Sequence, residues 1–260
     1  MTFKDRIDSS SWQIPPANIS LKLAEVHLWR ASLLPEQTAE FWCLLSQDEQ
    51  QRAEKFRQPK AQQWFIAARG ILRLLLSRYL NCPPQALAFT YGAHGKPMLQ
   101  RSFNDLRLEF NLTHSGDLAL YAFTLEHPLG IDLEQIRPDF NYLAIAQRFF
   151  SAQEVASLLS LPLAEQPTAF FQIWTAKEAY IKAEGGSVFA GLSQFEVKLL
   201  QIPAENAWRI DQPISDRCLL YTLNPGPDYV ASLVQTVPSN LPVTKQPISV
   251  QCWQWSQIQS

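Results

Sequence analysis

The sequence has little of what builds a disulfide scaffold, a metal–thiolate site or a membrane anchor. Its four cysteines, Cys43, Cys82, Cys218 and Cys252, are scattered over 260 residues and form no C-x-x-C pair. This spacing predicts free, buried thiols and a reducing compartment. No run approaches the roughly 18 apolar residues that a membrane-spanning helix needs, and no solenoid-length period recurs.

A large excess of charge of one sign is also missing. The 22 Lys and Arg residues nearly balance 24 Asp and Glu residues, for a net charge of -2. This balance excludes a strongly basic nucleic-acid-coating protein, although it leaves room for a local basic patch. Lys4, Asp5, Arg6 and Asp8 lie where a signal peptide would have its apolar core. We therefore expect a cytoplasmic protein with no membrane or nucleic-acid partner, and we also expect a monomer.

The pattern of apolar residues predicts a mixed α/β (α+β) fold with a substantial core, since 47% of the residues are hydrophobic. Helices are expected after Ser46, and over 62–80, 141–150, 151–159 and 168–184. Strands are expected over 21–33, 118–125, 129–136, 195–200, 208–210, 217–223, 229–234 and 248–255, with 238–247 as a linker.

The segment from Arg52 to Arg78 carries seven basic residues against the single acid Glu54. Its apolar residues recur at helical spacing, so a solvated basic helix face is one interpretation. A docking surface for an acidic partner protein is the other.

Two polar turns follow this helix. Gly92-Ala93-His94-Gly95-Lys96-Pro97 permits a tight turn that presents Lys96, and a lysine on such a turn can hold a phosphate. Phe110-Asn111-Leu112-Thr113-His114-Ser115-Gly116 places His114 among hydroxyl groups. A surface hydrogen-bonding role and a ligand-binding role are both open for this histidine.

Acidic residues then occur in an apolar context. Asp132 and Glu134 alternate in the strand Leu129-Gly130-Ile131-Asp132-Leu133-Glu134, so both side chains point to one face. Glu178 and Lys182 are four residues apart in a helical pattern and also share a face. Buried carboxylates must be paired, protonated or metal-bound, and oxygen donors without His or Cys favour Mg²⁺ or Mn²⁺. Simple pairing with basic side chains is the alternative.

These motifs in this order resemble the signature of the 4'-phosphopantetheinyl transferase superfamily. Gly130-Ile131-Asp132-Leu133-Glu134 and Trp174-Thr175-Ala176-Lys177-Glu178-Ala179 with Lys182 are similar to its paired acidic motifs. Gly95-Lys96-Pro97 and the turn at His114 resemble its two upstream motifs, with Thr113 where the family commonly has Ser. The chain length resembles the larger, surfactin-type (Sfp-type) branch.

The resemblance implies two similar α/β subdomains related by a pseudo-twofold, the 4'-phosphopantetheinyl transferase fold, which we expect over 1–129 and 130–260. It implies transfer of the 4'-phosphopantetheine arm of coenzyme A to a serine of an acyl or peptidyl carrier protein of fatty-acid, polyketide or nonribosomal-peptide synthesis. Mg²⁺ would be held by Asp132, Glu134 and Glu178. The resemblance implies that three residues act in catalysis, namely Asp132, Glu178 and Lys182. It implies that the nucleotide is bound by Arg52, Arg69, Lys96, Pro97, Thr113, His114 and Lys182.

Two other classes share part of this inventory. A metal-dependent nuclease or phosphodiesterase also combines an acidic strand with a later acid and lysine, although its Glu-x-Lys usually lies on a strand. A non-catalytic relative that binds coenzyme A or a carrier protein is the second alternative.

Overall fold

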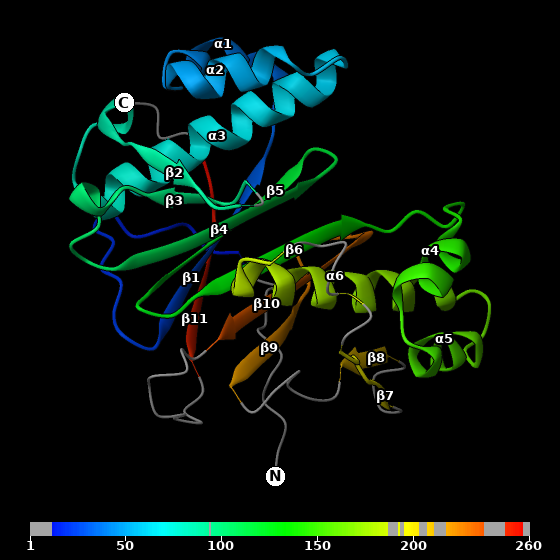
Figure 1. The fold of residues 1–260 in the computed structure, drawn as a ribbon. Helices are drawn as coiled ribbons and strands as arrows, with labels where there is room; N and C mark the ends of the chain where they lie inside the picture. The colour runs from blue at the N-terminus through cyan, green and yellow to red at the C-terminus, as the bar shows by residue number, and fades with distance from the viewer. Residues whose placement is uncertain are drawn as a thin grey trace.

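The strands form two main sheets and two small hairpins (Figure 1). In the first sheet the order is β11–β1–β5–β4, from β1 (Glu25–Ser32), β4 (Leu108–Ser115), β5 (Leu118–Leu125) and β11 (Ser249–Gln254). In the second it is β6–β10–β9, from β6 (Leu129–Gln135), β9 (Cys218–Leu223) and β10 (Tyr229–Thr236). The hairpins pair β2 (Phe89–Tyr91) with β3 (Pro97–Leu99), and β7 (Leu199–Ile202) with β8 (Ala207–Ile210). This computed structural model describes residues 12–93, 95–186, 192, 195–202, 207–210, 217–236 and 248–256.

The helices fall into two groups along the chain. The first group is α1 (Thr38–Trp42), α2 (Gln47–Glu54) and α3 (Pro59–Leu80), and the second is α4 (Tyr142–Phe149), α5 (Ala152–Leu159) and α6 (Gln166–Glu184). Single 3₁₀ turns occur at η1 (Pro35–Gln37), η2 (Pro84–Ala86) and η3 (Arg101–Phe103). Capping boxes at Ser46 and Ser151 begin α2 and α5 as the sequence predicts, and left-handed residues Asn81 and Gly185 end α3 and α6.

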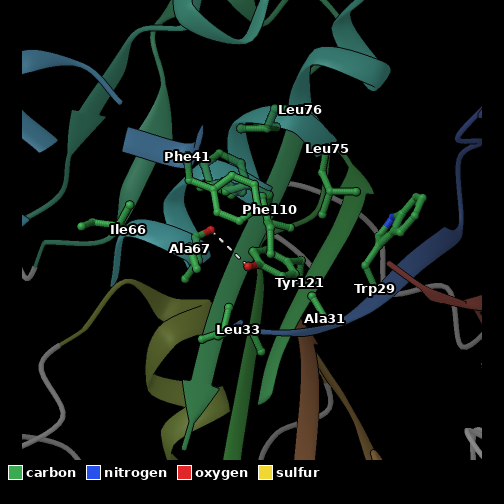
Figure 2. Close-up of a cluster of buried hydrophobic side chains, with 14 of the residues drawn as sticks. Trp29, Ala31, Leu33, Phe41, Ile66, Ala67, Leu75, Leu76, Phe110 and Tyr121 are labelled. Carbon is green, nitrogen blue, oxygen red and sulfur yellow. Dashed lines mark hydrogen bonds between the residues drawn. The ribbon is translucent and has the colours of Figure 1, made fainter. Parts of the chain in front are cut away.

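Side chains that alternate along each strand divide the core into layers. Trp29, Phe110 and Tyr121 leave the first sheet on the side covered by α3, where the Tyr121 hydroxyl donates to the Ala68 carbonyl oxygen at 3.1 Å (Figure 2). Leu28 and Ala122 leave the opposite face of the same strands and pack against apolar residues of the second sheet. The second sheet in turn buries its other face under α6. Each sheet therefore has its own long helix, and the two sheets share a core.

The last strand does not stay with the half of the sequence that precedes it. β11 pairs in parallel with β1, from Glu25 opposite Ser249 to Arg30 opposite Gln254. The carboxyl-terminal end of the described chain thus completes the sheet formed by the amino-terminal half. A parallel pairing needs a long crossover connection, and the chain between β1 and β11 contains the whole second sheet.

Most of the predicted elements are present, with shifted ends. The helix expected from residue 62 begins at Pro59, which suits a first helical position because its missing N–H needs no partner there. The strand expected over 195–200 is wrong before residue 199. There, the Phe195 carbonyl and the Val197 amide bond to side chains of α6 and α5 instead of a neighbouring strand. The expected linker 238–247 lies outside the described residues.

None of the four cysteines, all of which lie in the described residues, forms a disulfide, as predicted, but their predicted burial holds only for Cys218, while Cys43 is exposed. No described helix is long and apolar enough to cross a membrane.

At Gly130, β6 and α6 approach each other closely. A Cβ atom built on Gly130 would lie 2.0 Å from the Ala179 carbonyl oxygen and 2.5 Å from the Ala183 nitrogen. Only glycine allows the helix backbone to come this near to the strand. The small residues Ala179 and Ala183 are buried on the facing side of α6.

A buried ion pair anchors α6 to α5. The Lys177 ammonium lies 2.9 Å from the Glu154 carboxylate and donates to the carbonyl oxygens of Leu192 and Phe195, both at 2.6 Å. Glu154 also accepts from the backbone amide of Val197 at 2.7 Å. Both charges are almost completely buried, so Lys177 has a structural role although it lies beside Glu178.

We expect Gly130→Ala to destabilise the fold by about 1–3 kcal/mol or more, because the added methyl group overlaps backbone atoms that belong to a packed helix. Urea unfolding measures the loss. Gly186→Ala is the matched control, since its Cβ would meet nothing nearer than 3.6 Å. Equal stabilities of the two variants would contradict the contact at Gly130.

We expect Lys177→Met to cost about 3–5 kcal/mol, because it leaves the Glu154 carboxylate buried without its cation. Lys198→Met, on an exposed side chain, should change the free energy of unfolding by less than about 0.5 kcal/mol. A Lys177→Met protein as stable as the Lys198→Met protein would refute the buried pair.

Candidate active site

Asp132 lies at the centre of a group of polar side chains between β6 and α6. Alternation along β6 turns Ile131 and Leu133 into the core shared by the sheets, and Asp132 and Glu134 toward the opposite face. One oxygen of Asp132 accepts from the Lys182 ammonium at 2.5 Å and from the Thr113 hydroxyl at 3.2 Å. The other, Oδ2, is buried and has no hydrogen-bond partner. Asp132 is 5% exposed, so this lone oxygen is a candidate ligand atom.

The helix α6 supplies the rest of the acidic group. Glu178 and Lys182 are one turn apart on the side that faces β6, where Gly130 allows close contact. Lys182 also donates to the carbonyl oxygen of Ile131 at 3.3 Å. Glu178 is 8% exposed. The structure thus brings together the two acidic motifs, whose residues Glu134 and Glu178 have 43 residues between them in the sequence.

The carboxyl groups of this site hold protons more tightly than ordinary carboxyl groups do. Burial, together with the negative charges of Asp132 and Glu134, raises the pKa of Glu178 from 4.5 to about 7, against the opposing effect of Lys182. Burial also raises the pKa of Asp132 and, with the charge of Asp132, that of Glu134. The charge of Asp132 raises the pKa of Lys182 despite its burial. Three acids and one ammonium leave the site short of positive charge when the acids are ionised.

The donor chemistry of the site suits a hard divalent cation. The acidic side chains offer only oxygen atoms, one of them buried and unpartnered, and their mutual repulsion would be relieved by added positive charge. Among the described residues, no three His, Cys, Asp or Glu side chains already stand in ligating arrangement. In this structure the Lys182 ammonium is paired with Oδ1 of Asp132.

Lys96 and Pro97 connect the first half of the chain to this site. The Lys96 ammonium donates to the carbonyl oxygens of Leu129, at 3.0 Å, and of Lys182, at 2.8 Å. Burial lowers its pKa. Pro97 begins β3 directly after it. Lys96, which the sequence predicts to bind a phosphate, thus has protein partners at the end of α6 and the start of β6.

The two arginines predicted to bind a nucleotide differ in accessibility. Arg52 is exposed, and its guanidinium lies near the turn at Gly95 and over the ring of Phe65. Arg69 is 4% exposed, with its guanidinium over Phe65 and Tyr91 and 4.0 Å from the buried carboxylate of Glu49. Burial lowers the pKa of Arg69.

Glu49 explains why part of the basic helix is not a solvated face. Its carboxylate accepts from Arg73 at 2.7 Å, and Arg73 also donates to the carbonyl oxygens of Pro84 and Leu87. Both side chains are fully buried. The solvated-face interpretation is therefore wrong for Arg69 and Arg73, because a buried acid from α2 pairs with them.

The polar turn predicted around His114 is wrong, because Leu108–Ser115 is the strand β4 and the chain turns only at Gly116. His114 and Thr113 point to opposite faces of this strand. Thr113 is buried against Asp132, whereas His114 is solvent-accessible with its ring centroid 6.4 Å from that of Trp64. Partial desolvation and the charge of Lys182 lower the pKa of His114. His114 is therefore neutral near pH 7, and its ring nitrogens can exchange hydrogen bonds with a ligand.

Two residues that contact β6 have no role predicted from the sequence. Ser115 donates to the Glu134 carboxylate at 3.0 Å, and the Asn111 side-chain oxygen accepts from the Ile131 amide at 2.9 Å. The signal available in the sequence is their alternation with Thr113, which puts all three on one face of a strand.

The raised pKa of Glu178 predicts that the metal-free protein is less stable at high pH. A folded-state pKa above the unfolded one gives a contribution to stability that is complete below about pH 4.5 and is lost as the pH rises through 7. We expect Glu178→Gln to be more stable than wild type by roughly 2–3 kcal/mol at pH 8, with no difference near pH 4. Urea unfolding with a chelator tests this, and a pH-independent difference would contradict it.

Comparisons with known proteins agree with the geometry. The family model described as "4'-phosphopantetheinyl transferase superfamily" matches residues 128–234, and the one described as "4'-phosphopantetheinyl transferase, N-terminal" matches residues 28–125. The chain is 39% identical over 213 residues to the 4'-phosphopantetheinyl transferase HetI of Nostoc sp., covering 79% of this chain and 90% of that protein.

It is also 30% identical over 199 residues to the 4'-phosphopantetheinyl transferase Sfp of Bacillus subtilis, covering 76% of this chain and 84% of that protein. A crystal structure of Thermotoga maritima holo-[acyl-carrier-protein] synthase aligns with a TM-score of 0.30 and 17% identity, over 42% of this chain and 62% of that one. The two family models and the similarity to HetI and Sfp establish that this chain belongs to the 4'-phosphopantetheinyl transferase superfamily, on its Sfp-type branch.

Proposed function

We propose that the chain transfers the 4'-phosphopantetheine moiety of coenzyme A to a serine of an apo acyl or peptidyl carrier protein and releases 3',5'-ADP. The observation that carries the proposal is the desolvated group of Asp132, Glu178 and Lys182 between β6 and α6. Such a group could hold a divalent cation that neutralises a pyrophosphate, while one of its carboxylates accepts a proton. The membership in the transferase superfamily supplies the reaction class.

Asp132, Glu134 and Glu178 would hold Mg²⁺, or Mn²⁺ in its place. Bound there, the cation supplies positive charge to the pyrophosphate oxygens. The orphaned oxygen of Asp132 and the raised pKa of Glu178 support this assignment.

Glu178 would accept the proton of the carrier serine, since its buried carboxylate lies among the charged groups of the site, beside Asp132, Glu134 and Lys182. A serine hydroxyl attacks well only if its proton is removed as the bond to phosphorus forms. Lys182, whose pKa is raised, keeps its positive charge and would stabilise the negative charge that develops on the leaving phosphate.

The nucleotide would be held by the first half of the chain. Arg52 and His114 are exposed on the side of the Gly95 turn and β4, and both can bond directly to phosphate oxygens. The nucleotide would be supported indirectly by Arg69, Thr113 and the Lys96–Pro97 turn. Their polar groups are buried or bonded to the protein, so they would hold the binding surface in place from inside. A lysine that contacts the nucleotide directly would first have to leave Leu129 and Lys182.

The remaining proposals concern organisation and partners. We assign residues 1–129 to a nucleotide-binding half and 130–260 to a metal-binding half, related by a pseudo-twofold, with β11 returning to the first sheet. The exposed basic residues Lys55, Arg57 and Lys60 would face an acidic carrier protein. The protein would act as a cytoplasmic monomer without nucleic-acid or membrane partners. The nuclease alternative is disfavoured because Glu178 and Lys182 lie on a helix.

We expect Asp132→Ala and Glu178→Gln each to lower the rate of carrier loading by about 10²–10³, because each removes a charge from the reacting centre. Intact mass spectrometry of apo-carrier proteins incubated with coenzyme A and Mg²⁺ measures loading. Glu184→Gln, on the exposed end of the same helix, should load at the wild-type rate. Near-normal loading by folded Asp132→Ala protein would refute the assignment, and wild-type protein that loads no carrier would favour a non-catalytic relative.

A further inference from the structure

The edge of β6 that faces the first sheet is bonded by side chains instead of a strand. In the described sheets β6 pairs with β10 alone, and β4 ends the neighbouring sheet. The Asn111 side-chain oxygen accepts from the Ile131 amide at 2.9 Å, and the Ser115 hydroxyl accepts from the Gln135 amide at 3.1 Å. A buried backbone amide without a partner would be costly. The side chains of β4 thus replace a missing strand pairing.

On the β4 side, this contact has the two-residue period of a strand. Asn111, Thr113 and Ser115 alternate along β4 and project from one face toward β6. Their partners, Ile131, Asp132 and then Glu134 with Gln135, follow in order along β6. The three β4 residues hold the acidic strand in one register.

Ser115 makes two contacts with the end of the acidic strand. Its hydroxyl donates to the Glu134 carboxylate at 3.0 Å while it accepts from the Gln135 amide. The next residue, Gly116, has a φ of +58°, and a Cβ there would lie 3.1 Å from the Tyr229 hydroxyl. This tight turn brings Ser115 to the last two residues of β6.

The consequence for Glu134 is a loss of freedom. A glutamate at the end of a strand has three side-chain torsions that would otherwise vary, and the Ser115 bond selects an orientation in which one oxygen is engaged and the other is left for a ligand. Groups that orient metal-ligating side chains in this way contribute about 10–100-fold in metal affinity or activity.

We propose that Ser115 and Asn111 are positioning residues for the transfer reaction: they hold β6 in register from the opposite sheet, and Ser115 orients Glu134 toward the cation. The inference rests on the proposed function of Asp132 and Glu134 as metal ligands. Neither side chain needs to touch coenzyme A or the carrier protein.

The test uses the full-length protein with Ser115→Ala, Ser115→Thr and the control Ser77→Ala, a half-buried serine whose hydroxyl bonds only to its own helix, at the Leu74 carbonyl. Calorimetric titration with Mn²⁺ in the presence of coenzyme A measures affinity directly, and carrier loading at varied Mg²⁺ measures the activation constant. We expect Ser115→Ala to weaken Mn²⁺ binding and raise the Mg²⁺ requirement about 10-fold or more. The rate at saturating Mg²⁺ and the KM for coenzyme A should stay within a factor of about three.

Ser115→Thr and a Glu134→Gln background distinguish a positioning role of Ser115 from a general loss of structure. Ser115→Thr keeps the hydroxyl and should restore Mn²⁺ affinity, whereas Ser77→Ala should match wild type. In a Glu134→Gln background, Ser115→Ala should add less than about twofold, because both changes act through one contact. For Asn111, Asn111→Ala should also weaken Mn²⁺ binding, because the Ile131 amide loses its acceptor oxygen.

Two results would overturn the inference in different ways. Wild-type Mn²⁺ affinity and Mg²⁺ dependence in folded Ser115→Ala protein would refute the positioning role alone. A wild-type protein that binds no Mn²⁺ and loads carrier in the presence of a chelator would refute the metal assignment as well.

Discussion

The approach of α6 to β6 at Gly130 is the contact on which the site depends. Because Gly130 has no side chain, backbone atoms of the helix come within about van der Waals distance of the strand. The same packing places Glu178 and Lys182 beside Asp132 and lets Lys96 reach the Lys182 carbonyl from the first half. A larger residue at this point would separate the carboxylates before it disturbed any of them directly.

The site places three carboxyl groups in a buried position, where ionised carboxylates are unfavourable. Burial raises the pKa values of all three carboxyl groups, the negative charges of neighbouring acids raise those of Glu134 and Glu178 further, and Lys182 compensates for only part of this. The apolar side of α6, with Phe170, Phe171 and Ile173 buried, offsets the cost. The arrangement trades stability for a centre that can bind positive charge and move a proton.

The basic residues of the first half fall into two kinds with different physical roles. Glu49 draws Arg73 and Arg69 into the interior, where they connect α2, α3 and the segment after α3. Arg52 stays exposed near the Gly95 turn. The division matters for recognition, because only accessible cations can meet an anionic ligand at low cost.

The amino-acid sequence was enough to predict the mixed fold class, most helix and strand positions, and the acidic and basic motifs of the site, because these follow from local periodicity, capping residues and motif order. It did not determine the return of β11 to the first sheet, the burial of Arg69 and Arg73, or the protein partners of Lys96. Nor did it reveal that Asn111 and Ser115 bond to β6. Each of these contacts joins residues distant along the chain, and pairing across the fold decides whether a charge is solvated, buried or shared. Only the tertiary structure could distinguish a lysine that faces a ligand from one that links two halves.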